Sequence, residues 1–208
     1  MTSYDHFIRL LVLIGFLIGG LLLTTLVSGL LMLASGMSLA DIMKMAQSGM
    51  GALSPGLTRG LLATQHLLIF ILPGLLFGLV FYQGKFLNGL NLDVHPGWQL
   101  SILGIFFLMA AYPLVNLSFL ANESIPLPAW ADKFESQAED TLKAILTMNT
   151  PVIFIFNLII IAILPGIGEE LIFRGILQKH IGLLFKSPVA AIWIAAFIFS
   201  AIHLQFEG

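Results

Sequence analysis

Long apolar segments separated by short polar ones dominate the sequence. A helix that crosses a membrane needs about 20 mostly apolar residues. The candidate segments are Leu10–Ala34, Leu61–Tyr82, Leu100–Leu120, Pro151 to about Ile167, and Pro188–Leu204. The pattern therefore predicts an all-α fold, in the form of a polytopic transmembrane helical bundle.

Prolines inside these segments predict kinked helices, because proline lacks a backbone donor and its ring crowds the preceding turn. Pro73 lies in the second segment and Pro113 in the third. In the fourth segment, Pro165-Gly166 predicts a break, after which the helix continues to about Phe185. Thr150 and Ser187 each precede a proline, which is typical of a capped helix start.

A polar stretch over 121–150 separates the third and fourth spans. Trp130, Phe134, Ala138 and Leu142 recur there every four residues, with charges on the other face. This spacing predicts an amphipathic helix, which lies either on the membrane surface or packed on the bundle as a connector. We therefore divide the chain into N-terminal spans (1–120), this connector (121–150) and a C-terminal region (151–208).

The segment Ser35–Gly60 between the first two spans has a different character. It contains a weakly amphipathic stretch, Leu39–Ala46, and is otherwise rich in glycine, serine and proline. This composition predicts a mobile connector.

Composition supports a membrane protein in contact with the lipid bilayer. Hydrophobic residues make up 58% of the 208 residues and charged residues 10%, against about 25% charged in soluble domains. The mean hydropathy is +1.00. A net charge of −2 gives no electrostatic reason to expect nucleic-acid binding, and the absence of cysteine excludes disulfides and thiol catalysis. Lysine and arginine are spread evenly among the loops, so the positive-inside rule gives no orientation.

Charged residues interrupt the apolar C-terminal region at Glu169, Glu170 and Arg174. A charge at membrane depth costs about 2.5–3.5 kcal/mol on insertion scales and usually marks a site. On a helix, Glu170 and Arg174 share a face, whereas Glu169 lies about 100° away. Arg174 can thus hold one acid ionised while the other acid faces a cavity.

His203 and Phe199 lie one turn apart on the last predicted helix. If this helix neighbours the acids, Glu169 and His203 could share a water and activate it, with or without a metal. Structural explanations stay open: the Glu170–Arg174 pair could only fix packing, and a single histidine at a helix end is often interfacial. We also expect His180 to be interfacial. His66 could face a cavity, but we expect a core histidine with its hydrogen bonds satisfied.

The pattern Glu169-Glu170-x-x-x-Arg174 followed by Phe199-x-x-x-His203 resembles the first two motifs of the CPBP intramembrane metalloproteases. This family includes the type II CAAX prenyl endopeptidases and the bacteriocin-processing, Abi-like proteins. The flanking glycines Gly168 and Gly175 also fit. The resemblance covers about the last third of the chain and makes 151–208 the first part of a protease-like core.

The resemblance implies a membrane-embedded endopeptidase that hydrolyses a peptide bond near the membrane-anchored end of a protein or peptide substrate. Glu169 would be catalytic, with Glu170 and Arg174 in support, and His203 would share the activation of the water, next to Phe199. No cofactor follows with certainty; a divalent metal such as zinc would be held by Glu169 and His203. We expect a multi-pass protein of a bacterial inner membrane.

The family also has a further histidine, usually followed four residues later by asparagine, on a later helix. None follows His203 before the sequence ends at Gly208, so we expect a fragment that lacks the later core helices. Two alternatives stay open. One is a catalytically silent family member that acts as a membrane scaffold or immunity protein. The other is a proton-coupled transporter.

Overall fold

Helices form almost all of this chain. The computed structural model describes residues 2–48, 50, 53–90, 93, 97–123, 125–126 and 128–203, and no strand occurs among them. The long helices are α1 (Ser3–Ala34), α6 (Gly97–Glu123), α7 (Ala129–Leu146) and α11 (Pro188–His203), and the short ones are α2 (Leu39–Ser48) and α5 (Phe86–Gly89). Two further helices, each made of several consecutive helical segments, run without a break over Pro55–Tyr82 and Pro151–Phe185, and we call them rods. The predicted all-α bundle is confirmed.

Four of these helices are long and apolar enough to cross a membrane, namely Ser3–Ala34, Pro55–Tyr82, Gly97–Glu123 and Pro151–Phe185. The helix α11 is apolar but shorter, with 16 residues. Its predicted last residue, Leu204, lies outside the described residues. The four spans correspond to the first four predicted from the apolar pattern.

Helix caps explain why two spans begin earlier than the apolar pattern predicts. Before α1, the Thr2 backbone N–H donates to Asp5 Oδ2 (2.6 Å) and the Asp5 N–H donates to Thr2 Oγ1 (3.3 Å), which forms a capping box. Before α3 (Pro55–His66), Ser54 caps the first turn and Pro55 occupies the first helical position. The predicted connector Ser35–Gly60 is therefore wrong in part, because α2 and the first turns of α3 are helical; residues 49, 51 and 52 lie outside the described part.

The two rods that contain Pro73 and Pro165 are built alike. In the first, α3 leads through a π-helical turn, η2 (Leu67–Ile71), into α4 (Leu72–Tyr82). In the second, α8 (Pro151–Leu158) leads through η4 (Ile159–Ile163) into α9 (Leu164–Glu169), followed by the π-helical segment η5 (Glu170–Gln178) and α10 (Lys179–Phe185). The predicted break at Pro165-Gly166 is wrong.

The wider π-helical turns give a physical reason for this continuity. Each comes directly before a Leu-Pro-Gly sequence, and the leucine N–H bonds five residues back, from Leu72 to Leu67 and from Leu164 to Ile159. A wider turn removes the clash between the proline ring and the carbonyl of the preceding turn. The helix can then continue through the proline.

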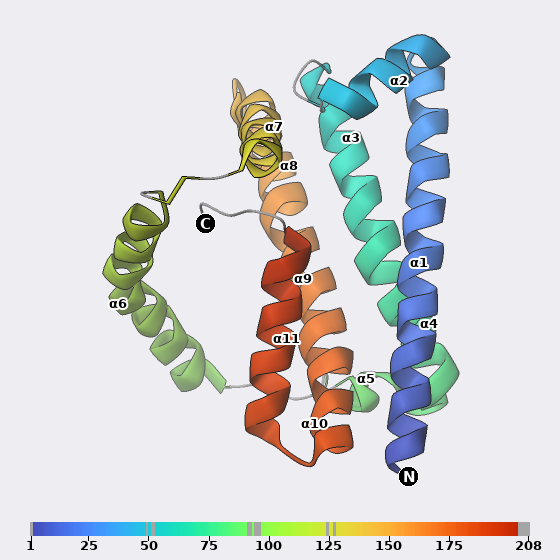
Figure 1. Cartoon of the computed structure of the whole chain (residues 1–208), viewed down its shortest axis with the longest axis vertical. Coiled ribbons are helices and arrows are strands. Elements are labelled where there is room, and N and C mark those ends of the chain that lie inside the picture. Colours follow the sequence, from blue (N-terminus) through green and yellow to red (C-terminus); the bar gives the residue numbers. More distant parts are fainter. Residues whose placement is uncertain are drawn as a thin grey trace.

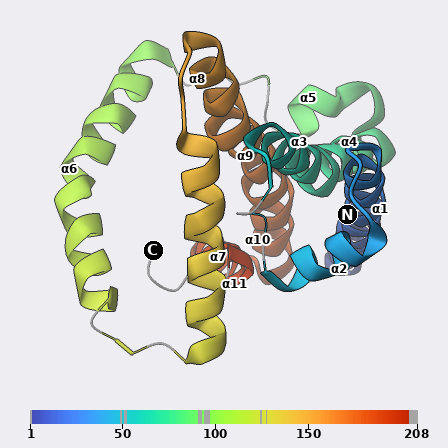
Figure 2. The same cartoon turned by 90° about the horizontal axis from the view of Figure 1, so that it is seen from above.

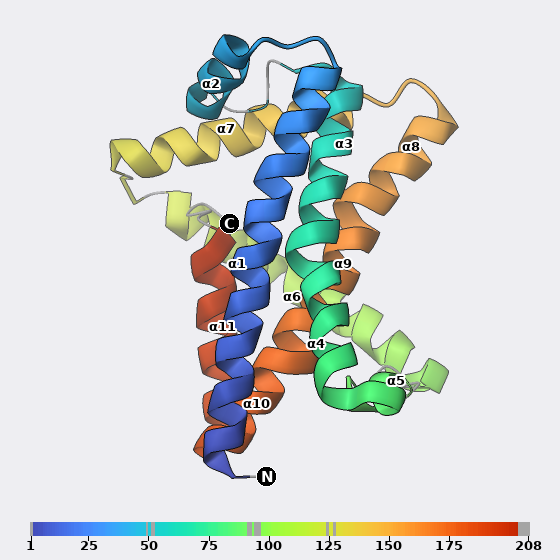
Figure 3. The same ribbon diagram turned by 90° about the vertical axis from the view of Figure 1, so that its right-hand side faces the viewer.

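The rods that hold the site form one bundle. Helices α1 and α11 run in one direction, and the rods α3–α4 and α8–α10 run in the other (Figures 1 and 3). The buried core lies where α1, α4, η5 and α11 meet, around Leu13, Phe77, Ile172 and Ile176. Helix α6 stands apart from this bundle (Figure 2), and none of its residues is buried.

The connector helix α7 joins α6 to the bundle across one end (Figure 2). Ala131 and Ile145 on α7 are buried, at 0% and 3% exposed, whereas Trp130, Phe134 and Leu142 of the predicted stripe stay about half exposed. At its C-terminal end, Arg59 of α3 donates to the Ile145 and Thr147 carbonyls (3.0 and 3.2 Å). The exposed part of this stripe can therefore contact lipid.

A buried network joins three helices at the end of the bundle that holds the N-terminus. The Nδ1 atoms of His6 and His180 lie 3.0 Å apart, and His180 Nε2 lies 3.3 Å from the Tyr82 hydroxyl. His6 is 7% and His180 1% exposed. Instead of facing the membrane interface as we expected, His180 is buried and links α10 to α1 and α4.

Gly20 allows α1 to approach η2 closely. A Cβ added there would overlap the Leu68 carbonyl oxygen and lie 3.1 Å from Cγ of Pro73, whereas a Cβ at Gly19 would meet nothing within 4 Å. Small residues permit such backbone contacts between membrane helices. The neighbouring glycines thus differ sharply in their surroundings.

We predict that Gly20→Ala lowers the melting temperature and that Gly19→Ala keeps or raises it. Crowding packed atoms costs about 1–3 kcal/mol, while alanine in open helix gains up to about 1 kcal/mol over glycine. Thermal unfolding of both purified variants in the same detergent measures the difference. Equal melting temperatures would contradict the close contact of α1 with η2.

Candidate active site

Glu169 is the last residue of α9 and is placed by the glycine before it. A Cβ on Gly168 would lie 2.8 Å from Cβ of Phe70 and 3.2 Å from Cγ1 of Ile71. Only glycine lets α9 pack this closely against η2. The Glu169 side chain is 18% exposed, so the carboxylate lies inside the bundle with a restricted opening.

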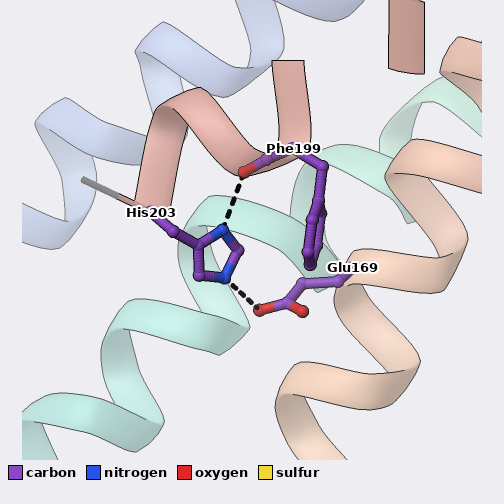
Figure 4. A network of polar contacts seen from close by, with 3 residues as sticks. All are labelled: Glu169, Phe199 and His203. Atoms are coloured by element: carbon purple, nitrogen blue, oxygen red, sulfur yellow. Dashed lines mark hydrogen bonds and ion pairs between the residues drawn. The ribbon is translucent and has the colours of Figure 1, made fainter. Parts of the chain in front are cut away.

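His203 approaches this carboxylate from α11. Its Nε2 lies 3.9 Å from Oε1 of Glu169, and its Nδ1 lies 2.8 Å from the Phe199 carbonyl oxygen (Figure 4). Because a carbonyl only accepts, Nδ1 carries the proton in this bond. In the neutral imidazole, Nε2 is then an acceptor that faces Glu169.

The 3.9 Å separation is longer than a direct hydrogen bond, and a polar contact of this kind is a place to expect a bridging water. A carboxylate oxygen and a neutral imidazole Nε2 both accept. One water can therefore donate its two hydrogens to Glu169 and His203, which leaves a lone pair on its oxygen.

Aromatic side chains hold the imidazole in place. The Phe199 ring lies 4.4 Å from the His203 ring, and the Phe173 ring meets Phe199 at 5.0 Å and 90°. These contacts join α11 to η5 directly beside the site. The geometry of Phe199 and His203 is thus fixed both by a hydrogen bond and by ring packing.

Glu170 and Arg174 form an ion pair that points away from Glu169. The Arg174 Nη1 lies 3.0 Å from Glu170 Oε2, and the side chains are 74% and 54% exposed, respectively. The structure brings Glu169, Phe199 and His203 together and leaves this pair beside them. Both members lie on η5, a π-helical segment of a kind often found at functional sites.

His66 is the polar residue near the site that sequence reasoning misjudged. Its Nδ1 is buried and has no hydrogen-bond partner among the described residues, so the expected satisfied core histidine is wrong. Its ring stacks on the Phe70 ring, with centroids 6.0 Å apart and an interplanar angle of 26°. The signal in the sequence was Gln65-His66, a polar pair inside an apolar span.

Comparison with protein families identifies the segment that forms this site. Residues 151–207 match the family model "Type II CAAX prenyl endopeptidase Rce1-like". This part of the chain is similar to the type II CAAX prenyl endopeptidases. No curated protein and no solved structure matches the chain.

The matched segment, residues 151–207, contains α8 to α11 and therefore Glu169 and His203. The spans α1 and α3–α4 lie outside the match, although both pack against it. Much of what surrounds the two motifs thus comes from a part of the chain that the family model does not cover.

The described part of the chain contains no complete set of ligands for a metal ion. Catalytic zinc takes three protein ligands, and no group of three or more histidine, cysteine or acidic residues there is arranged to hold an ion. Glu169 and His203 would supply two. The mechanism below therefore includes no step through a metal.

We predict that Glu170→Gln changes the melting temperature by about 2 °C or less. An exposed pair four residues apart contributes about 0.3–0.5 kcal/mol, and 1 kcal/mol shifts the melting temperature of a domain of this size by about 2–4 °C. Thermal unfolding beside the wild type measures the shift. A drop of 8 °C or more would show that this pair holds the helices together.

Proposed function

We propose that this chain is a multi-pass intramembrane endopeptidase of a bacterial inner membrane. It would hydrolyse a peptide bond near the membrane-anchored end of a protein or peptide substrate. The observation that carries this proposal is the approach of His203 on α11 to Glu169 on the preceding rod, inside an apolar bundle. The CAAX family match points to proteolysis.

In the proposed reaction, Glu169 acts as the general base. The water between Glu169 and His203 attacks the scissile carbonyl carbon, and one of its protons passes to the Glu169 carboxylate. The carbonyl π electrons move to oxygen and form a tetrahedral oxyanion. When this intermediate collapses, the C–N bond breaks and the leaving amine takes the proton from Glu169.

In this reaction, His203 positions the attacking water. Its Nδ1–H is held by the Phe199 carbonyl, so Nε2 stays free to accept from the water and to orient it. A low-dielectric bundle strengthens these polar contacts. The partial exposure of both side chains, 18% for Glu169 and 34% for His203, leaves an opening for substrate.

We predict that Glu169→Gln lowers the cleavage rate by about 10²–10⁴-fold, the range typical of a general base. The assay uses a fluorogenic peptide with a farnesylated cysteine and the full chain in liposomes. His203→Ala is expected to reduce the rate as well. Glu139→Gln, which removes an exposed carboxylate on α7, is the control and keeps the wild-type rate.

Cleavage of this peptide by Glu169→Gln at the wild-type rate would end the proposal. A silent scaffold or immunity protein would instead show no cleavage by any of these chains. A transporter would show proton or solute flux into liposomes that Glu170→Gln abolishes. The family match favours the protease over the transporter, and the cleavage assay separates it from the silent family member.

A further inference from the structure

Two cations lie together at the end of the bundle that holds the N-terminus. Arg9 of α1 and Lys179 of α10 are both partly buried, and both approach the ring of Tyr82, the last residue of α4. The Arg9 Cζ lies 5.7 Å and the Lys179 Nζ 5.1 Å from the centroid of this ring. Two positive charges from different helices thus converge on one side chain, more than two helical turns along the rod from Glu169.

Packing and a hydrogen bond hold both cations in place. The Arg9 Cζ also lies over the Phe81 ring, 4.7 Å from its centroid. The Lys179 Nζ donates to the Gly89 carbonyl oxygen (2.6 Å). A guanidinium has five N–H donors and an ammonium has three, which is more than these contacts can use. Both side chains therefore keep donors for a further partner.

No carboxylate balances these two charges in the part of the chain that the structure describes, where every ion pair lies elsewhere. Asp5, one turn before Arg9, is engaged in the capping box of α1. Asp93 accepts from Asn88 Nδ2 (3.0 Å). A charge that is drawn out of water is costly unless it is paired. Two adjacent cations without a counter-charge therefore indicate an anion that comes from outside the chain.

The buried histidine network fixes the spacing of the two cations. His180 directly follows Lys179, and it contacts both the Tyr82 hydroxyl (3.3 Å to Nε2) and His6 (3.0 Å between the Nδ1 atoms). His6 in turn lies one turn before Arg9 on α1. The helices that carry the cations and the ring are thus joined by buried polar contacts. Such a site is preformed, unlike a pair of mobile surface lysines.

The depth of Arg9 along α1 matches the level of lipid phosphates. α1 has 32 residues, whereas about 20 cross the hydrocarbon core. About six residues therefore project at each end, and Arg9, the seventh residue of α1, lies at the boundary. Long cationic side chains reach headgroup level from there, and basic pockets between spans bind lipid headgroups. Leu11 and Val80, near Arg9 and Tyr82 on their helices, are exposed and can contact acyl chains.

We propose that Arg9 and Lys179, held at the ring of Tyr82, form a binding site for a phosphate group. The guanidinium binds phosphate oxygens through its planar fork of N–H donors, and the ammonium adds a second charge-assisted contact. An anionic phospholipid and a free phosphate share this chemistry, and the depth of the site favours the lipid. The bound phosphate would bridge α1 and α10. This site does not depend on the proposed peptidase reaction.

The test titrates the full chain, purified and delipidated in detergent, with short-chain phosphatidylglycerol, and native mass spectrometry measures the dissociation constant. Arg9→Gln and Lys179→Gln each remove one cation and keep a polar side chain. We expect each to weaken binding by about 10–100-fold, the effect of losing one hydrogen bond to a charged group. The matched control, Lys186→Gln, removes an exposed lysine at the same end of the bundle (Figure 1) and should bind like the wild type.

A second measurement follows the melting temperature with and without excess phosphatidylglycerol. A ligand that binds only the folded bundle raises the melting temperature, so the wild type and Lys186→Gln should show the same rise. The rise should shrink in Arg9→Gln and Lys179→Gln. Arg9→Lys keeps the charge but loses the planar fork, and its affinity should lie between those of Arg9→Gln and the wild type.

Two further ligands identify the source of the phosphate. Inorganic phosphate carries no acyl chains, and if it leaves phosphatidylglycerol bound, the site binds a lipid. If it displaces the lipid from the wild type but not from Lys179→Gln, the site binds free phosphate. Phosphatidylcholine, whose choline cation offsets its phosphate, should bind more weakly than phosphatidylglycerol.

Three results would overturn the proposal. Equal binding of phosphatidylcholine would show that acyl chains alone hold the lipid. An equal loss of affinity in Lys186→Gln would show that only the general surface charge matters. Wild-type affinity in both Arg9→Gln and Lys179→Gln would show that these two cations bind no phosphate.

Discussion

The close contact of Gly168 with Phe70 is the constraint on which the site depends. Because no Cβ fits at this point, α9 lies directly against the proline-containing rod of the N-terminal half. That contact places the Glu169 carboxylate inside the bundle, where α11 can bring His203 to it. A bulkier residue at 168 would push the two rods apart and displace Glu169 from its position beside His203.

Two rods with the same local design meet at this contact. Each has a π-helical turn followed by Leu-Pro-Gly, and Gly20 of α1 and Gly168 of α9 both approach the turn η2 of the first rod closely. The widened turns keep the helices continuous, while the glycines bring backbones together without a large side chain between them. Packing of small residues, rather than ion pairing, therefore fixes the site. The Glu170–Arg174 pair is largely exposed and contributes little to it.

Much of this could be predicted from the sequence, and the rest depended on tertiary structure. The lengths of the apolar segments located the spans. Charged residues at membrane depth drew attention to Glu169, and the Phe199–His203 spacing on the last helix drew attention to His203. The break expected at Pro165-Gly166 was wrong because a π-helical turn is not visible in hydrophobic periodicity. His66 was assigned to the core with its hydrogen bonds satisfied, because the sequence does not show which partners the packed helices leave within reach of its Nδ1. The catalytic roles of all five residues, Glu169, Glu170, Arg174, Phe199 and His203, stay predictions.

The convergence of Glu169 and His203 within the membrane can be measured directly, because the chain contains no cysteine. Glu169→Cys with His203→Cys is compared with Glu170→Cys with His203→Cys, each treated in native membranes with a short bifunctional thiol reagent. We expect rapid cross-linking of the 169–203 pair and little of the 170–203 pair, since the Glu170 side chain is largely exposed and pairs with Arg174. Equal cross-linking of both pairs, or faster reaction of the 170–203 pair, would contradict it.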